Sequence, residues 1–360
     1  MGLTIDGSRT QGARRRSVIV LAVVAVALTT LAAAAKPAHA FEIAVQDDHT
    51  FLARTSYSRE HALDQARAIG ATVLRVNVIY ADWVRLGTGP YDSLVDLARS
   101  KGFRLHFTLM GTPRYFDARA PRWIGHKYPS PIRFATWVSE VASHFKGRVR
   151  RYSIWNEPNL VYYLEPQRKA ASMYANLFKA GYRTIKRIDP GAQVLWGELF
   201  SGNLRNPGGT PPMNFLWAAT RSGARADGLA YHPFQYNLAP QQKSKRYVGI
   251  SSISTIKANL RDLARRGRLR TPSGKPLPIY FTEFGYQILG SAPVRSEARR
   301  ASWTVSAFRI AKRAGVRSML LYHLVRTYTR KWDSGVITLG GTPLLTYRAL
   351  LGARRALVGR

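Results

Sequence analysis

The stretch RRYSIWNEPN, residues 150–159, is a short apolar run that leads into a glutamate, Glu157. A second stretch, PIYFTEFG at residues 278–285, has the same form and leads into Glu283. Short runs rich in aromatic and β-branched residues are typical of buried strands. Both stretches are therefore predicted to be strands that carry a carboxyl group at their C-terminal end.

The rest of the chain past residue 40 alternates short apolar runs with longer amphipathic ones, which indicates βα units and a parallel sheet. The predicted strands cover residues 41–46, 72–78, 103–109, 150–155, 193–196, 228–231, 277–282 and 318–322. The predicted helices cover residues 58–69, 91–100, 131–145, 167–188, 212–222, 252–266, 296–314 and 344–356. Eight units fill residues 41–360 with no linker left over, so the sequence predicts an α/β fold, a single (β/α)8 TIM barrel. The alternative is an open doubly wound sheet, but no Gly-rich phosphate loop follows the first strand.

The first 40 residues predict a secretory signal peptide. A positive segment at residues 14–16 precedes an apolar run at residues 18–35, and residues 38–40 form an A-x-A cleavage pattern. Cleavage near Ala40 would release residues 41–360 as a protein that is secreted or held in the cell envelope. The alternative is an uncleaved membrane anchor, because the apolar run is close to the length that spans a bilayer.

The composition is strongly basic, with a formal net charge of +35. The basic residues are spread along the whole chain and form neither a zinc-finger spacing, an RNP-like aromatic motif nor a clear recognition helix, so no specific nucleic-acid partner is expected. A solvated, Arg-rich surface explains the charge most simply. The alternative is attraction to an anionic envelope, membrane surface or acidic polysaccharide.

Several catalytic chemistries do not fit the residues present. The chain has no cysteine, which excludes a disulfide scaffold, a thiol nucleophile and a Cys-ligated metal. Its eight histidines form no HExxH motif and no repeated HxH, and no G-x-S-x-G elbow occurs. We therefore expect neither a metal nor another cofactor.

The two glutamates fall at the same end of the predicted barrel. Reacting groups of such barrels lie at the C-terminal ends of the strands and on the loops that follow them. The fourth and seventh strands lie across the barrel from one another, so Glu157 and Glu283 are predicted to face each other over a pocket. Glycoside cleavage needs such a pair, one group to protonate the leaving oxygen and the other to attack the anomeric carbon or activate water.

The motifs WNEPNL at residues 155–160 and TEFG at residues 282–285 resemble those of the clan A glycoside hydrolases, most closely families 39 and 5. The resemblance extends over residues 41–360 in strand order, but its sharp motifs cover only about a dozen residues. It implies a retaining glycosidase that acts on a β-linked poly- or oligosaccharide, with Glu157 as acid/base and Glu283 as nucleophile. That role requires a raised pKa for Glu157, from partial burial and from the charge of Glu283.

Three further residues match places in the clan where side chains support these acids. Arg75, inside the second predicted strand, would hold the nucleophile, since an Arg within an apolar strand is costly unless it is paired. Asn156 would bind the sugar 2-hydroxyl, and His232, at the end of the sixth strand, would line the pocket. Phe234 departs from the clan's usual Tyr, whose hydroxyl could be supplied by Tyr231 or Tyr236 instead.

Other residues are candidates for substrate contacts by position and type alone. Glu198, after the fifth predicted strand, is expected to be a third acid at the rim, either in the pocket or in a loop. Tyr322 ends the eighth strand, where family members often carry a Trp, so Tyr322 or Trp332 would be the aromatic platform for a sugar. The remaining loop aromatics are Trp83, Trp123, Tyr162 and Tyr163.

Two other functions stay compatible with this sequence. A non-catalytic glycan-binding protein on the same fold would usually lack one of the two glutamates, and both are present. A transglycosylase would use the same residues, because water and a sugar hydroxyl compete for one covalent intermediate.

Overall fold

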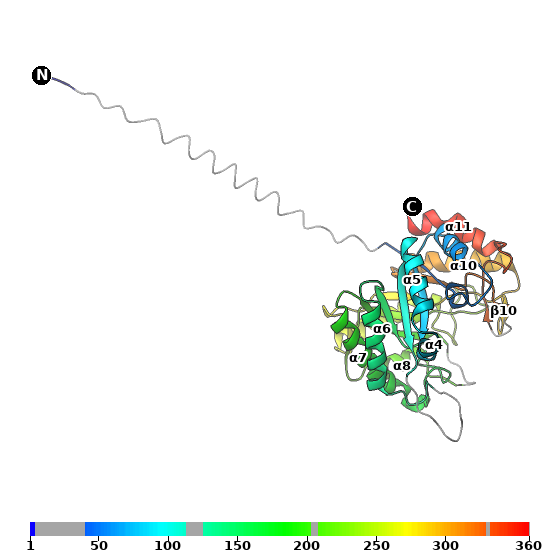
Figure 1. Cartoon of the computed structure of the whole chain (residues 1–360), viewed down its shortest axis with the longest axis horizontal. Coiled ribbons are helices and arrows are strands. Elements are labelled where there is room, and N and C mark those ends of the chain that lie inside the picture. Colours follow the sequence, from blue (N-terminus) through cyan, green and yellow to red (C-terminus); the bar gives the residue numbers. More distant parts are fainter. Residues whose placement is uncertain (4–39, 113–124, 203–207, 329–331, 360) are drawn as a thin grey trace. The chain divides into compact units, whose positions relative to one another are not determined.

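The computed structural model describes residues 1–3, 40–112, 125–202, 208–328 and 332–359 (Figure 1). Residues 41–360 form one compact unit, distinct from residues 1–40. The apolar run and the cleavage pattern that predict a signal peptide lie, up to residue 39, outside the described residues. Among the helices that are described, none is both long and apolar enough to cross a membrane.

Eight parallel strands close into a barrel, which confirms the fold predicted from the alternating pattern. Each strand pairs with the next one along the chain, and the last pairs with the first, Ser318–Tyr322 against Glu42–Gln46. The strands are β1 (Glu42–Gln46), β2 (Ala71–Ile79), β3 (Arg104–Met110), β4 (Arg151–Ile154), β5 (Gln193–Phe200), β7 (Gly228–His232), β9 (Ile279–Phe281) and β11 (Ser318–Tyr322). The main difference from the prediction is in β5, which continues to Phe200 instead of ending at Trp196.

A helix follows each strand and covers the outside of the barrel (Figure 1). These helices are α3 (Arg59–Ala68), α5 (Gly89–Ser100), α6 (Pro131–His144), α7 (Gln167–Ile188), α8 (Pro212–Ala219), α9 (Ile253–Arg265), α10 (Glu297–Arg313) and α11 (Leu345–Val358). The shorter elements are α2 (Asp48–Phe51), α4 (Tyr80–Leu86), η1 (Ile250–Ser252), the pair β6 (Ala224–Arg225) and β8 (Leu269–Arg270), and the pair β10 (Leu289–Gly290) and β12 (Trp332–Asp333).

Serine residues start three of the covering helices. The hydroxyls of Ser58, Ser130 and Ser296 each accept a hydrogen bond from the backbone N–H three residues further along, in α3, α6 and α10. Such a cap stabilises a helix by about 1 kcal/mol, since it satisfies an N–H that has no partner within the helix. These caps explain why the predicted and observed helix starts agree closely.

The two faces of β2 show how the barrel interior is divided. Leu74, Val76 and Val78 point outward and belong to the large core beneath the helices. The alternate residues point into the barrel, where Val73 packs in a small apolar cluster and Arg75 lies further along the strand. The interior is therefore apolar near the strand starts and polar toward their C-terminal ends, where the candidate site lies.

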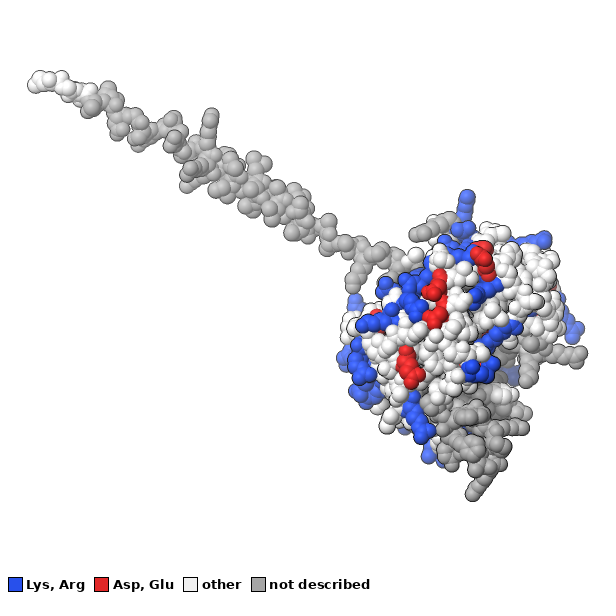
Figure 2. Space-filling model, viewed as in Figure 1, with Lys and Arg blue, Asp and Glu red and all other residues white. Residues whose placement is uncertain are grey.

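Basic side chains are spread over the face of the molecule seen in Figure 2. Helices α7 and α11 carry no acidic residue, and the one acid of α10, Glu297, is paired with Arg300 at 2.6 Å. These three helices on the outside of the barrel therefore carry a net positive charge.

Candidate active site

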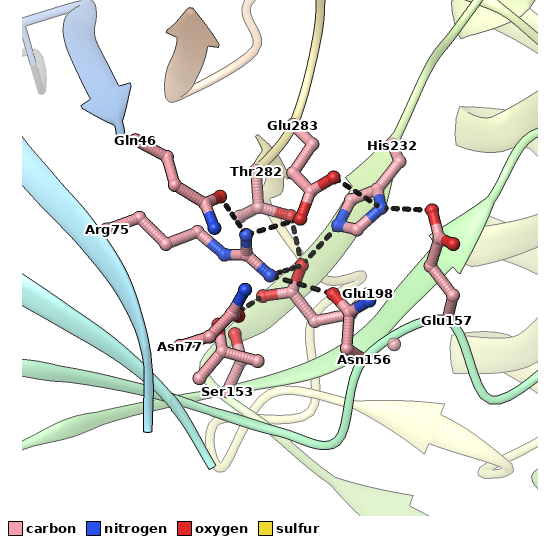
Figure 3. A network of polar contacts seen from close by, with 12 residues as sticks. Gln46, Arg75, Asn77, Ser153, Asn156, Glu157, Glu198, His232, Thr282 and Glu283 are labelled. Carbon is pink, nitrogen blue, oxygen red and sulfur yellow. Dashed lines mark hydrogen bonds and ion pairs between the residues drawn. The ribbon is translucent and has the colours of Figure 1, made fainter. Parts of the chain in front are cut away.

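Glu157 and Glu283 meet at the C-terminal ends of the strands, just after β4 and β9 (Figure 3). Both are largely buried, with 7% and 6% of their surface exposed. One oxygen of each carboxyl group and one ring nitrogen of His232 all lie within 4.8 Å of one another. The predicted pairing of two carboxyl groups across the barrel is therefore present in the structure.

The backbone around Glu157 is held in an unusual conformation. Trp155 and Glu157 have positive φ angles of 69° and 39°, which is rare for residues other than glycine. The Trp155 indole N–H donates to the Tyr163 carbonyl at 2.6 Å, and the Glu157 N–H donates to the Glu198 carbonyl at 3.0 Å. Asn159 binds the backbone N–H and the carbonyl of Phe200, both at 3.0 Å, which ties this loop to the end of β5. Strained backbone that is fixed by its surroundings is common at functional sites.

Arg75 is fully buried on β2 and connects several of the site residues. Its Nη1 donates to Glu283 Oε1 at 2.6 Å and also to Gln46, while its Nη2 donates to Asn156 Oδ1 at 3.0 Å and to Glu198 Oε2 at 3.2 Å. These acceptors compensate for burying the guanidinium. Asn156 thus accepts from Arg75 through its oxygen, and its side chain also forms a hydrogen bond with that of Tyr163.

His232, the last residue of β7, lies between two carboxyl groups and is fully buried. Its Nδ1 is 2.8 Å from Glu157 Oε1, and its Nε2 is 2.6 Å from Glu198 Oε2. Burial opposes protonation, but the Glu283 charge and the hydrogen bonds to Glu157 and Glu198 raise the pKa of His232 to about 9. The side chain is thus an imidazolium at neutral pH and donates to both neighbours.

Glu198 corrects an expectation, because it is not a rim acid in a loop after the fifth strand. It lies within β5 and is fully buried, at a point where the register shifts between Gly197 and Leu199. Its φ angle is 51°, and that of Gly197 is 119°. Such a bulge turns a side chain to the other face of a sheet, and here it directs the carboxylate into the barrel.

Several protein groups surround Glu198. Its Oε2 accepts from Thr282 Oγ1 at 2.6 Å and from Arg75 and His232. Although burial favours the neutral acid, the Arg75 charge and the His232 hydrogen bond hold the pKa of Glu198 well below its usual range. Glu198 is therefore an ionised carboxylate below Glu157 and Glu283 in the barrel interior, with no exposed surface through which to bind substrate.

The pKa of Glu157 is raised, the direction that the acid/base role requires. Burial is the main cause, and the charge of Glu283 acts in the same direction, whereas the hydrogen bond from His232 opposes them. The net effect keeps a proton on Glu157 at a higher pH than on an ordinary glutamate.

Aromatic side chains surround the carboxyl pair. Tyr322 and Trp332 both belong to the cluster around Phe234, and the Trp332 ring lies 4.8 Å from that of Phe234. Burial and the Glu283 charge raise the pKa of Tyr322 well above its usual value, so its hydroxyl stays protonated close to that acid. Both predicted platform residues are therefore near the site.

Tyr163, one of the predicted loop aromatics, and Tyr236, one of the two predicted sources of the missing hydroxyl, also lie at the site. Burial and the charges of Glu157 and Glu283 raise the pKa of Tyr163, and burial and the Glu157 charge raise that of Tyr236. The hydroxyl of Tyr231 instead donates to the Val248 carbonyl at 2.8 Å. Tyr163 and Tyr236 are both half-buried in turns, and the closed barrel brings them to the acids.

The structure does not bring Trp83 to this site. Its ring packs in the helical layer, 6.0 Å from Tyr91 and 6.3 Å from Phe145. Tyr162 lines a cavity of about 250 Å³ beside the ends of β2 to β4, which it shares with Tyr163. Trp123 lies outside the described residues.

The three clustered ligand atoms of Glu157, His232 and Glu283 raise the question of a metal ion. Metal-bound histidine must be neutral, but His232 is held as a cation by two carboxylates. Arg75 already donates to Glu283. Two positive charges thus balance the ionised acids, and the donor set fits a metal poorly.

No protein-family model and no curated protein match the sequence, but solved structures do. A family 39 glycoside hydrolase from the gut symbiont Bacteroides cellulosilyticus WH2 is 16% identical with a TM-score of 0.66, over 88% of this chain and 64% of that chain. The GH39 enzyme from Xanthomonas axonopodis pv. citri is 18% identical with a TM-score of 0.62, over 90% and 67%. Xylanase 10B from Thermotoga maritima is 17% identical with a TM-score of 0.59, over 89% and 96%. At these identities the likeness shows a shared (β/α)8 fold, and the chain spans about two thirds of the length of the first two.

Proposed function

We propose that this chain is a retaining glycoside hydrolase that cleaves O-glycosidic bonds of a poly- or oligosaccharide. The observation that carries the proposal is the short distance between Glu157 and Glu283. One carboxyl oxygen of Glu157 lies within 4.8 Å of one carboxyl oxygen of Glu283. Retaining enzymes hold their two carboxyl groups about 5–5.5 Å apart, whereas inverting enzymes leave about 6.5–9.5 Å for a water molecule. The short separation favours direct attack by one carboxylate.

The surroundings of the two acids favour different roles. Glu157, with its raised pKa, protonates the glycosidic oxygen as the bond from that oxygen to the anomeric carbon breaks. Glu283, whose anion Arg75 stabilises, forms a bond to the same carbon and gives a covalent ester. Its negative charge is then lost, so Glu157 ionises more easily and takes a proton from the water that hydrolyses the ester.

The names of the structurally similar proteins support the bond type and leave the sugar open. They include β-xylosidases, an exo-β-1,4-mannosidase, a xylanase and a glucosidase. These enzymes share cleavage of glycosidic bonds but differ in the sugar that they recognise. The proposal therefore concerns the reaction, with a β-linked glycan as the substrate class to test first.

The test is the variant Glu283→Ala on a panel of activated aryl β-glycosides, with and without azide. Loss of the nucleophile is expected to lower kcat by at least about 10³-fold, and azide, which fits the space left by the carboxylate, should restore turnover as an α-glycosyl azide. Glu165→Ala, in the loop after β4, is the matched control and should retain activity. Full activity of Glu283→Ala, or an azide product of β configuration, would contradict the proposal.

We also propose that the protein acts outside the cytoplasm and associates with anionic material there. The apolar run at residues 18–35 and the A-x-A pattern support export. The acid-free helices α7 and α11 support a general attraction to negative surfaces. Fractionation of the producing cells, with mass spectrometry of the N-terminus, tests export: a mature protein that begins at Phe41 is expected, and an intact cytoplasmic chain would argue against it.

A further inference from the structure

Glu198 is a third carboxyl group at the site and is ionised, and the proposed reaction does not use it directly. It is fully buried and accepts hydrogen bonds from Arg75, His232 and Thr282. The bulge in β5 and the positive φ angle of Glu198 show that the backbone is distorted at the point where this side chain turns inward. A buried charge on strained backbone costs stability, so its contacts are the place to look for a function.

The contact with His232 determines how that ring is oriented and protonated. An ionised carboxylate can only accept, so the His232 Nε2 that lies 2.6 Å from Glu198 Oε2 must carry a proton. The ring edge is thereby fixed toward Glu198, which directs Nδ1 toward Glu157 Oε1 at 2.8 Å. No other orientation of the ring makes both contacts.

The consequence reaches the acid/base. With Nδ1–H donating to Oε1, that oxygen of Glu157 is engaged by the protein. The proton that is transferred to a leaving group must then reside on the other oxygen, Oε2. His232 thus distinguishes the two oxygens of an otherwise symmetric carboxyl group.

We propose that Glu198 is a positioning residue for the acid/base: through His232 it engages Oε1 of Glu157 and leaves Oε2 as the oxygen that exchanges the proton with the glycosidic oxygen. This inference rests on the proposed function, because Glu198 can position an acid/base only if Glu157 has that role. In each turnover Oε2 gives its proton to the leaving oxygen and regains one from the attacking water, while His232 keeps both of its ring protons and Glu198 stays ionised.

A purely structural role for Glu198 predicts something different. If the carboxylate only filled and neutralised the barrel interior, its loss would reduce the amount of folded enzyme and would lower the rates of all substrates by the same factor. If Glu198 positions the acid, removing it will lower the rate most for substrates whose leaving group needs a proton. Leaving-group dependence therefore separates the two roles.

The test is Glu198→Gln, which keeps the size of the side chain and removes its charge. For alkyl β-glycosides, whose leaving groups need protonation, kcat/KM is expected to fall about 100-fold, the lower part of the range for general acid catalysis. For a dinitrophenyl glycoside, whose leaving group needs no proton, it should fall less than about fivefold. The upper pH limit of activity should also move to lower pH, since His232 loses its proton more easily without the Glu198 charge.

The controls separate failure of this inference from failure of the proposed function. Labelling of Glu283 by an activated 2-fluoro glycoside in wild type and in Glu198→Gln tests the nucleophile alone. Glu165→Gln makes the same substitution on a loop outside the site and should leave both substrate classes unchanged. If Glu198→Gln does not fold, His232→Gln replaces it and is expected to show the same leaving-group dependence.

Each outcome decides one question. Equal losses on alkyl and dinitrophenyl glycosides, with Glu283 still labelled, would overturn the positioning role and leave the glycosidase proposal in place. Absence of labelling and of turnover in the wild type would overturn the glycosidase proposal itself. A selective loss on alkyl glycosides with labelling intact supports both.

Discussion

At the scale of single residues, the balance of charge at the site depends on His232. Glu198, Glu283 and Glu157 lie around it, and Arg75 supplies the only other positive charge that contacts these acids among the described residues. A histidine that gains such partners on folding binds its proton more tightly than in the unfolded chain. Its protonation therefore links the chemistry of the site to the stability of the fold.

The first prediction concerns stability against pH. The pKa of His232 rises from 6.5 to about 9 on folding, so its stabilising contribution is complete below pH 6.5 and is lost as the pH rises through about 9. The difference corresponds to about 3 kcal/mol as an upper limit. The measurement is urea unfolding of wild type and His232→Gln at pH 6 and at pH 10. Between these two pH values, the free energy of unfolding of wild type should fall by about this amount more than that of His232→Gln.

The control for that comparison is His61→Gln, a change at an exposed position of α3. It should follow the wild-type pH dependence, because its side chain has no buried carboxylate partner. An identical pH dependence in wild type and His232→Gln would show that His232 is not held as a cation in the folded protein.

At the scale of elements, the bulge in β5 connects backbone geometry with the site. Gly197 has a φ angle of 119°, and a Cβ atom there would lie 2.5 Å from the carbonyl oxygen of Ala230 on β7. Only glycine tolerates both the conformation and the close approach. Because Glu198 follows directly, the glycine allows the strand to turn that carboxylate into the barrel.

The second prediction tests this link with Gly197→Ala. The added methyl group must push β7 and β5 apart or flatten the bulge, so the free energy of unfolding is expected to fall by about 2–4 kcal/mol. Activity of the fraction that remains folded should also fall, because Glu198 and His232 move. Thermal unfolding together with active-site titration separates the two effects.

Gly352, within α11, provides the matched control. A Cβ atom there meets nothing within 4 Å, and the residue lies in a regular helix. Gly352→Ala should therefore raise the stability by up to about 1 kcal/mol and leave activity unchanged. If Gly197→Ala behaved like Gly352→Ala, the bulge would not depend on glycine.

At the scale of the whole molecule, the candidate active site and the basic surface residues lie in different places. The carboxyl pair lies inside the C-terminal end of the barrel, whereas basic side chains are scattered over the outer face seen in Figure 2 and occur on α7, α10 and α11. Because α7, α10 and α11 are all rich in basic residues, the proposed attraction to anionic material would be distributed over several helices.

The third prediction follows from that distribution. Residues 41–360 should bind phosphatidylglycerol vesicles at low salt, release them at about 0.5 M salt and ignore phosphatidylcholine vesicles. Two fourfold Gln variants, each without four positive charges, should weaken binding by about tenfold or more and to a similar degree. One set is Arg168, Lys169, Arg183 and Arg187 on α7, and the other is Arg309, Lys312, Arg354 and Arg355 on α10 and α11. Loss confined to one set would indicate a local site instead.

The sequence by itself determined the strands, the helices and the position of two glutamates at the ends of strands. These features are local: a strand needs a short apolar run, a helix needs its 3.6-residue pattern and a cap, and a catalytic acid ends a strand. The predicted and observed limits of β11 and α7 are identical for this reason.

Only the tertiary structure decided which other side chains meet those acids. The sequence predicts that the fifth strand ends just before Gly197 and Glu198, because a glycine and a charged residue interrupt the apolar run. In the structure β5 continues through a bulge and buries the Glu198 carboxylate. The sequence predicts Trp83 to be a loop aromatic of the pocket, yet its ring packs among the helices. Contacts such as those between Arg75, His232 and Glu198 join strands that are far apart in the chain, so they depend on the register and closure of the barrel, which no local pattern encodes.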